Sequence, residues 1–244
     1  MSPAGVPAAP SPSLAQAAAP SFTVLYEDAG VVAVDKPAGL SAIPERDPDR
    51  PCLVSLVAAW LGERLWVVHR LDKEVSGVIL FARSAEAHRH LNDEFAARRV
   101  CKTYLALAHG RISVDQGVIE RPVRTFGSGR AGVDDEHGKP SRTEFAVLAR
   151  ASEHTLVSAH PVTGRRHQLR VHFYSLGHSL AGDPRYGDPA IQGRIPRLML
   201  HALRLECRLP DGAPLVVEAP VPDTFTASLA ALTGLTVDPE GIVR

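Results

Sequence analysis

One segment of the chain gathers side chains that can do acid–base or nucleophilic chemistry. The apolar run 66–68 ends at the sequence His-Arg-Leu-Asp of residues 69–72, and Ser76 and Gly77 turn the chain into a second apolar run. Because a strand that ends in a polar loop places that loop at the edge of a sheet, we expect Asp72 to point into a cleft. A surface loop with an internal Arg–Asp pair fits the same residue types, and both interpretations stay open at this point.

A second, basic segment starts at Thr163 with the sequence Thr-Gly-Arg-Arg-His-Gln-Leu-Arg-Val-His. Its pattern predicts a helix over 165–176 with Thr163 as the N-cap. Arg165 and Arg166 would then lie in the first turn, where the helix dipole disfavours positive charge. A bound phosphate, or a buried carboxylate from elsewhere in the chain, would relieve that conflict. The alternative is a solvated basic face.

Other catalytic patterns are weak. Histidines are scattered through the chain, but no His-Glu-x-x-His sequence and no Cys/His set at zinc spacing occurs, so we expect no metal site. Asp72 and Glu74 could serve as the paired carboxylates of a glycosidase, but two neighbours in one loop need not converge. No Gly-x-Ser-x-Gly elbow and no phosphate-binding glycine loop is found.

The elements that must position these residues are short. Strands are expected at 22–26, 31–34, 66–68, 77–82, 103–108, 143–148, 155–159, 198–205 and 215–218. Helices are expected at 53–61, 84–98, 165–176 and 222–232, and the Gly- and Asp-rich residues 127–140 are expected to form a loop. Strands outnumber helices and often follow one another directly. This order favours an α+β fold on a mixed or antiparallel sheet over a doubly wound α/β fold.

Composition excludes several classes of protein. The 244 residues include 27 basic and 27 acidic side chains, so the formal net charge is zero, unlike that of many nucleic-acid binders. The basic residues are 23 Arg and four Lys, and eight of the Arg lie between Val162 and Arg208 with only three acids. A basic face can therefore exist on a neutral protein. No run approaches the roughly 20 apolar residues of a membrane span.

The chain is expected to be a cytoplasmic protein with one folded domain. Its three cysteines, Cys52, Cys101 and Cys207, lie far apart and are expected to be reduced thiols. The first 20 residues hold seven Ala, five Pro and no charged side chain, which predicts a flexible tail rather than a secretory signal. Residues 21–244 are then a single domain.

The blocks of sequence described above resemble, in their order, the RluA family of pseudouridine synthases. The resemblance runs from about Leu25 to Pro220. It is carried by Asp35-Lys-Pro-Ala-Gly39, His69-Arg-Leu-Asp72, Ser76-Gly77, Lys102-Thr-Tyr104, Gly110, Gly138-Lys-Pro140, Thr163-Gly-Arg165, His167-Gln-Leu-Arg170-Val-His172, Gly182-Asp183, Tyr186-Gly187 and Leu200-His-Ala202. It implies a long, bent mixed sheet flanked by helices and loops, with a central RNA-binding cleft. It also implies a short member without a separate N-terminal RNA-binding module.

The resemblance implies an isomerase that converts uridine to pseudouridine in structured RNA. Asp72 would be the catalytic carboxylate, Arg170 its partner, and Tyr104 the ring that stacks on the flipped uracil. The reaction is redox-neutral, so no cofactor is expected, and therefore no nucleotide cofactor. Further residues are expected to contact the substrate: Lys36, His69, Arg70, Arg165, Arg166, His167 and Gln168.

Two positions depart from the family pattern. Val75 stands where the family usually has Thr, so a hydroxyl that shapes the catalytic loop is missing. Arg166 stands where Thr or Ser is common, which adds a positive charge near the cleft. The expected partner is ribosomal or transfer RNA, with no membrane, and the enzyme is expected to be a monomer. The rival interpretations are a catalytically inactive RNA-binding relative and a metal-dependent hydrolase built on the histidines.

Overall fold

The computed structural model describes residues 22–45, 47, 49–241 and 243, and the expected tail at 1–20 lies outside them. Within this part of the chain, ten strands form one mixed sheet in the order β1-β2-β4-β11-β5-β10-β9-β6, with β3 beside β4 and β12 beside β11. These strands are β1 (Thr23–Glu27), β2 (Val31–Lys36), β3 (Trp66–Val67), β4 (Ser76–Ala82), β5 (Cys101–His109), β6 (Gln116–Glu120), β9 (Arg142–Arg150), β10 (His154–Pro161), β11 (Leu200–Arg208) and β12 (Pro214–Glu218). The expected α+β fold on a mixed sheet is confirmed.

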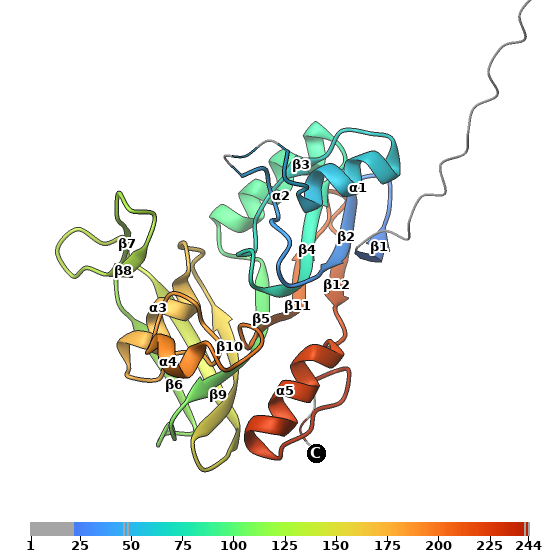
Figure 1. Cartoon of the computed structure of the whole chain (residues 1–244). Coiled ribbons are helices and arrows are strands. Elements are labelled where there is room, and N and C mark those ends of the chain that lie inside the picture. The colour runs from blue at the N-terminus through green and yellow to red at the C-terminus, as the bar shows by residue number, and fades with distance from the viewer. Residues whose placement is uncertain (1–21, 46, 48, 242, 244) are drawn as a thin grey trace, which may run out of the picture.

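The sheet passes through two lobes (Figure 1). One lobe holds β1 to β4 with the helices α1 (Leu53–Leu61) and α2 (Ala85–Ala96), and the other holds most of β5 to β10. The strand β11 joins them, because it pairs in parallel with β4 through His201 and Ser76 and antiparallel with β5. The lobes are therefore linked by a hydrogen-bonded ladder rather than by a loose linker.

The remaining helices lie in the lobe built on β5 to β10. The helix α3 (Gln168–Ser175) faces the small ribbon of β7 (Val123–Thr125) and β8 (Ala131–Val133), α4 (Pro189–Gln192) is a single turn, and α5 (Asp223–Thr233) packs Phe225 and Leu229 against the sheet. No helix in the described ranges is long and apolar enough to cross a bilayer.

Alternating and continuous apolar runs predict most of these elements. Residues 53–61 form α1 as expected, and Ser84 caps α2 by accepting a hydrogen bond from the N–H of Ala87. Two expectations are wrong. The segment 127–140 contains β8, and the predicted helix at 165 begins three residues later, at Gln168.

The late start of α3 has a local cause. The Thr163 hydroxyl donates to Oε1 of Gln168 at 2.7 Å and accepts from the N–H of Arg142 at 3.0 Å, so it is not an N-cap. The residue before the helix is His167, whose backbone is left-handed with φ 54°. Arg165 and Arg166 therefore precede the helix instead of occupying its first turn.

Candidate active site

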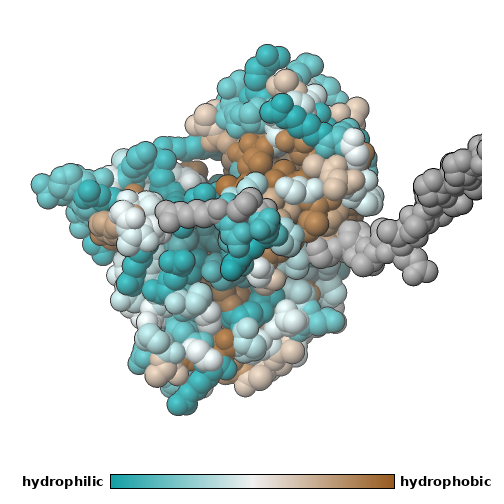
Figure 2. All heavy atoms as spheres, turned by 45° about the horizontal axis from the view of Figure 1, so that its top comes forward, coloured by the Kyte–Doolittle hydropathy of each residue, from teal (hydrophilic) through white to brown (hydrophobic). Residues whose placement is uncertain are grey.

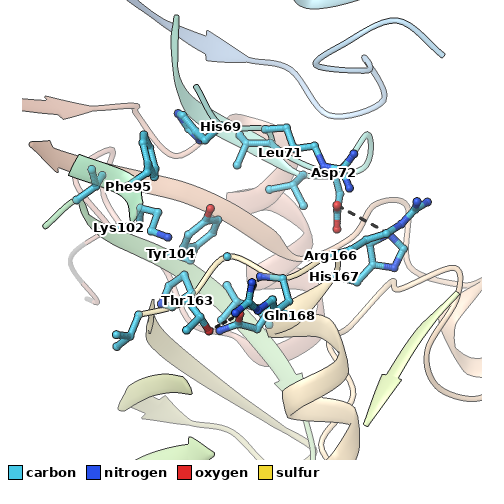
Figure 3. Close-up of a pocket in the computed structure, with 18 of the residues that line it drawn as sticks. His69, Leu71, Asp72, Phe95, Lys102, Tyr104, Thr163, Arg166, His167 and Gln168 are labelled. Atoms are coloured by element: carbon cyan, nitrogen blue, oxygen red, sulfur yellow. Dashed lines mark hydrogen bonds and ion pairs between the residues drawn. The ribbon is translucent and has the colours of Figure 1, made fainter. Parts of the chain in front are cut away.

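A cavity of about 510 Å³ lies where the two lobes meet, and it contains most of the residues singled out by sequence. Figure 2 shows the surface hollowed between the lobes, with hydrophilic side chains along much of the rim. The loop after β3, the strand β5, the segment before α3 and the first turn of α3 supply the walls (Figure 3). They contribute His69, Arg70, Asp72, Tyr104, Arg165, Arg166, His167, Gln168 and Arg170.

Asp72 lies in the loop between β3 and β4, and its side chain is one-fifth exposed. Its Oδ2 accepts a hydrogen bond from Nη1 of Arg170 at 3.2 Å, and its Oδ1 lies 3.8 Å from Nε2 of His167. The N–H of Val75 donates to the Asp72 carbonyl at 3.1 Å and closes the loop. The interpretation of a plain surface loop is therefore wrong, because this carboxylate lines the cavity and accepts a hydrogen bond from a buried arginine.

Arg170 is fully buried and binds carboxylates with every side of its guanidinium. Its Nε and Nη2 donate to the two oxygens of Asp183 at 2.7 and 2.8 Å, and its Nη1 also lies 3.4 Å from Glu74. Burial alone would lower the pKa of Arg170, but the hydrogen bonds and charges of Asp183, Asp72 and Glu74 together raise it. The guanidinium is thus permanently charged and offers one edge to Asp72. The buried carboxylate Asp183 binds Arg170, whereas Arg165 and Arg166, for which the conflict with the helix dipole was expected, precede α3.

Tyr104 lies on β5 and points its hydroxyl into the cavity between Asp72 and the far wall (Figure 3). Burial, together with the nearby charge of Asp72, raises the pKa of this phenol. The hydroxyl is therefore protonated at neutral pH, and the ring offers a flat surface beside the carboxylate.

His167 is buried next to Asp72. The Tyr186 hydroxyl donates to the Ala131 carbonyl at 3.0 Å, so the contact of 2.9 Å between that hydroxyl and Nδ1 of His167 requires Nδ1 to be the donor. Nε2 then faces Asp72. Burial lowers the pKa of His167, while the charge of Asp72 opposes that effect. The backbone of His167 is left-handed, and local strain of this kind collects at functional sites.

Two residues expected to contact the substrate have other roles. The Lys36 side chain is fully buried, and its Nζ donates to the carbonyls of Pro37, Leu40 and Lys73 at 2.9, 2.8 and 3.1 Å. Gln168 is also buried, and it spends both ends of its amide on neighbouring protein groups. Their hydrogen-bonding capacity is used inside the protein, and a contact of either residue with RNA stays a prediction. Lys36 instead joins the loop after β2 to the loop of Asp72.

The other expected contacts lie around the cavity. Arg70 and Arg166 are exposed, and Arg165 is half-buried with its guanidinium near the Pro140 carbonyl. His69 lies on the wall, where its Nε2 accepts from the N–H of Leu80 at 3.0 Å and its ring stacks on Phe95. Burial lowers the pKa of His69 to about 3, which keeps this acceptor neutral. His69 therefore holds the loop in place with its ring nitrogen.

A second hollow of about 920 Å³ continues on the other side of the Asp72 loop. Arg70, Arg166 and Arg185 line it together with the glycine-rich turn 127–129. Asp72 and His167 line both hollows. The catalytic carboxylate candidate thus stands in the middle of a groove that has basic side chains on its rim.

Sequence reasoning missed the support behind Arg170. Asp183 is buried and receives the N–H groups of Arg185 and Tyr186, while Gln192 accepts from the N–H groups of Gly182 and Asp183 at 2.6 and 3.2 Å. Gly182 and Asp183 are prominent in the sequence, but nothing in their spacing shows that they face Arg170. The departure at Val75 is buried in the main core cluster. Among the described residues, no cluster of three or more potential metal ligands is found.

The comparisons with known proteins agree with this site. A model of the RNA pseudouridylate synthase family matches residues 30–175. An uncharacterized RNA pseudouridine synthase of Zymomonas mobilis is 38% identical over 209 residues, which are 83% of this chain and 95% of that protein. The dual-specificity RNA pseudouridine synthase RluA of Escherichia coli K12 is 36% identical over 205 residues, 82% of this chain and 94% of that one.

Solved structures show the same fold. The human RNA Pseudouridylate Synthase Domain Containing 1 superposes with a TM-score of 0.73 and 28% identity, over 92% of this chain and 91% of that one. The human Domain Containing 4 protein gives a TM-score of 0.71 and 26% identity, over 86% and 92%. With its fold, its family match and its relatives in agreement, this chain belongs to the RluA family of RNA pseudouridine synthases, isomerases that convert uridine to pseudouridine in RNA.

Proposed function

We propose that the enzyme modifies uridines in stem-loops of large-subunit ribosomal RNA, transfer RNA or both, with Asp72 as its catalytic residue. The observation that carries the proposal is the carboxylate of Asp72, held by Arg170 at 3.2 Å in a cavity that also contains Tyr104. The names of relatives support the choice of RNA. One is a dual-specificity enzyme, and a 38% identical protein of Nitrosomonas europaea is a ribosomal large subunit pseudouridine synthase D, of which the match covers 68%.

The residues divide the reaction between them. The N1–C1′ bond of uridine breaks, the uracil turns, and a C5–C1′ bond forms, while one proton leaves C5 and one is gained at N1. Tyr104 stacks on the flipped base, which costs a few kcal/mol to extract from its stack. Asp72 acts as an ionised carboxylate, either by attacking the nucleoside or by accepting a proton in a glycal route. Arg170 holds that carboxylate in place through its hydrogen bond.

Loops and stem ends are the RNA segments that fit such a site, because their bases leave the stack at low cost. The basic rim of Arg70, Arg165 and Arg166 is suited to phosphates, which position RNA without reading its sequence. We further propose that residues 21–244 form one domain and that the enzyme works as a cytoplasmic monomer. The sheet shared by both lobes supports the single domain. Light scattering of the purified protein tests the monomer.

The test is a map of pseudouridine in total RNA from a strain lacking this gene, treated with wild-type protein or with Asp72→Asn. We expect one or a few stem-loop sites to be filled by the wild type and none by Asp72→Asn, because an amide can neither attack nor accept the proton. Thermal melting checks that the variant folds. Turnover by Asp72→Asn near the wild-type rate would contradict the role of Asp72. If no new pseudouridine formed in total RNA or in ribosomal precursor particles, the result would favour the catalytically inactive relative.

A further inference from the structure

A lysine that has no carboxylate and no hydrogen-bond acceptor beside its ammonium, among the described residues, lies on the wall of the cavity away from Asp72. Lys102 and Tyr104 are two residues apart on β5, so their side chains leave the same face of the sheet. Figure 3 shows Lys102 reaching into the cavity on the side of Tyr104 that is opposite to Asp72. The ammonium lies over the ring of Phe95, 6.0 Å from its centroid. Among the described residues, no carboxylate lies within ion-pair distance of it.

The other cations of the cavity are either paired or open to solvent. Arg170 is bound to three carboxylates, Arg165 lies near a carbonyl, and Arg98 and Arg166 are exposed. Lys102 is half-buried and has no such compensation. Burial lowers its pKa to about 8, so the side chain stays mostly charged at neutral pH. An unpaired charge at a partly desolvated position is unfavourable until an anion arrives.

We propose that Lys102 binds a backbone phosphate next to the flipped uridine, an inference that rests on the function proposed above. If the uracil lies on Tyr104, the two-residue step along β5 places Lys102 roughly 6.6–6.8 Å further along the strand. A flexible four-carbon side chain spans that distance easily. The flanking phosphate is the charged group that the nucleotide carries into this part of the cavity.

The chemistry of the side chain favours a phosphate over the uracil itself. Lysine is a compact point charge with three rotatable donors, which suits a phosphate approached from varied directions. The edges of uracil offer neutral carbonyls that cannot neutralise the ammonium. Because phosphates carry no sequence information, Lys102 contributes affinity and register, and it does not select the loop sequence.

The first experiment measures binding of the stem-loop mapped above as a function of salt. All variants carry Asp72→Asn, so that the RNA is held without turnover. Each phosphate contact to single-stranded RNA steepens the fall of log K with log salt by about 0.7. We expect Lys102→Met to reduce the slope by about 0.7 and Lys102→Arg to restore it. Arg111→Met, which removes an exposed charge beyond the opposite end of β5, should leave the slope unchanged.

The second experiment replaces one phosphate beside the target uridine with a neutral methylphosphonate. We expect the protein that keeps Lys102 to bind the methylphosphonate RNA as weakly as Lys102→Met binds normal RNA. Lys102→Met should lose no further affinity when it binds the methylphosphonate RNA. The experiment is done in turn for the phosphate on each side of the target uridine. The inference would be overturned if the affinity losses from the methylphosphonate and from Lys102→Met simply added at both positions, or if Lys102→Met left the salt slope unchanged. Failure of the proposed function has a separate signature, because wild-type enzyme would then form no pseudouridine in any RNA.

Discussion

Three carboxylates converge on a single guanidinium at the centre of the site. Arg170 binds Asp183 through two parallel hydrogen bonds and reaches Asp72 and Glu74 with its remaining nitrogen. Fixed donors of this kind stabilise a charged catalytic group without rearranging during the reaction. Asp183 is thus a positioning residue. It holds Arg170, and Arg170 holds Asp72.

We expect Arg170→Met to damage stability and activity together. Removing one partner of a buried ion pair costs about 3–5 kcal/mol, because Asp183 would remain buried without compensation. Urea unfolding beside a pseudouridine assay measures both effects. The double variant Arg170→Met/Asp183→Leu should recover part of the stability and none of the activity. The exposed Arg50 is the control, and Arg50→Met should change neither property. An unfolding free energy of Arg170→Met equal to that of the wild type would refute the pairing.

At the scale of elements, the parallel contact of β4 with β11 is the seam between the lobes. Ser76 on β4 faces His201 on β11, and the Ser76 hydroxyl lies 2.9 Å from Nδ1 of His201, while Nε2 of that ring donates to the Ala219 carbonyl at 3.1 Å. The ring is fully buried, and burial lowers the pKa of His201 to about 4. The seam is therefore built with neutral histidine.

This seam predicts a pH dependence of stability. Between pH 6.5 and about 4 the unfolded chain binds a proton at His201 while the folded chain does not, so acid favours unfolding. Over this window His201 contributes a slope of about 1.4 kcal/mol per pH unit to the unfolding free energy. Below pH 6.5, we expect His201→Gln to reduce the slope of the unfolding free energy against pH by that amount, measured by urea unfolding at several pH values. If the slope for His201→Gln were as steep as that of the wild type, His201 would be protonated in the folded protein.

Sequence patterns predict the elements better than their ends. The helix α1 lies at its expected bounds because Gly62 ends it in a left-handed conformation. The start of α3 was misplaced because Thr163 binds Gln168 and Arg142, and the partner Arg142 comes from a strand about twenty residues away. In the site, Asp72 and Arg170 were brought together as expected. The inward turn of Lys36 and the buried Asp183 depend on long-range contacts that residue spacing does not encode.

At the scale of the whole molecule, one close approach of backbones holds the lobes together. Gly77 has φ 113°, and a Cβ at this position would lie 2.1 Å from the Ala202 carbonyl oxygen. Because Ala202 is backbone on the neighbouring strand, neither side can move without opening the seam.

We expect Gly77→Ala to be among the most destabilising single methyl additions in this chain. Both the positive φ and the steric overlap oppose it. Gly212→Ala is the matched control, since Gly212 also has a positive φ, 85°, but open space around its Cβ position. Thermal melting should place Gly77→Ala well below Gly212→Ala. Equal melting temperatures would mean that the seam can open without cost.

The unbroken ladder from β1 to β6 has a consequence for how the enzyme meets its substrate. Enzymes that close over a ligand do so about hinges, which are loop residues free to change their backbone angles. Here the lobes on either side of Asp72 share main-chain hydrogen bonds, so we expect the protein to change its shape little when RNA binds. We then expect the RNA to supply most of the rearrangement. Discrimination among targets would follow from how readily each RNA loop bends to fit, with rigid helices excluded by their own stiffness.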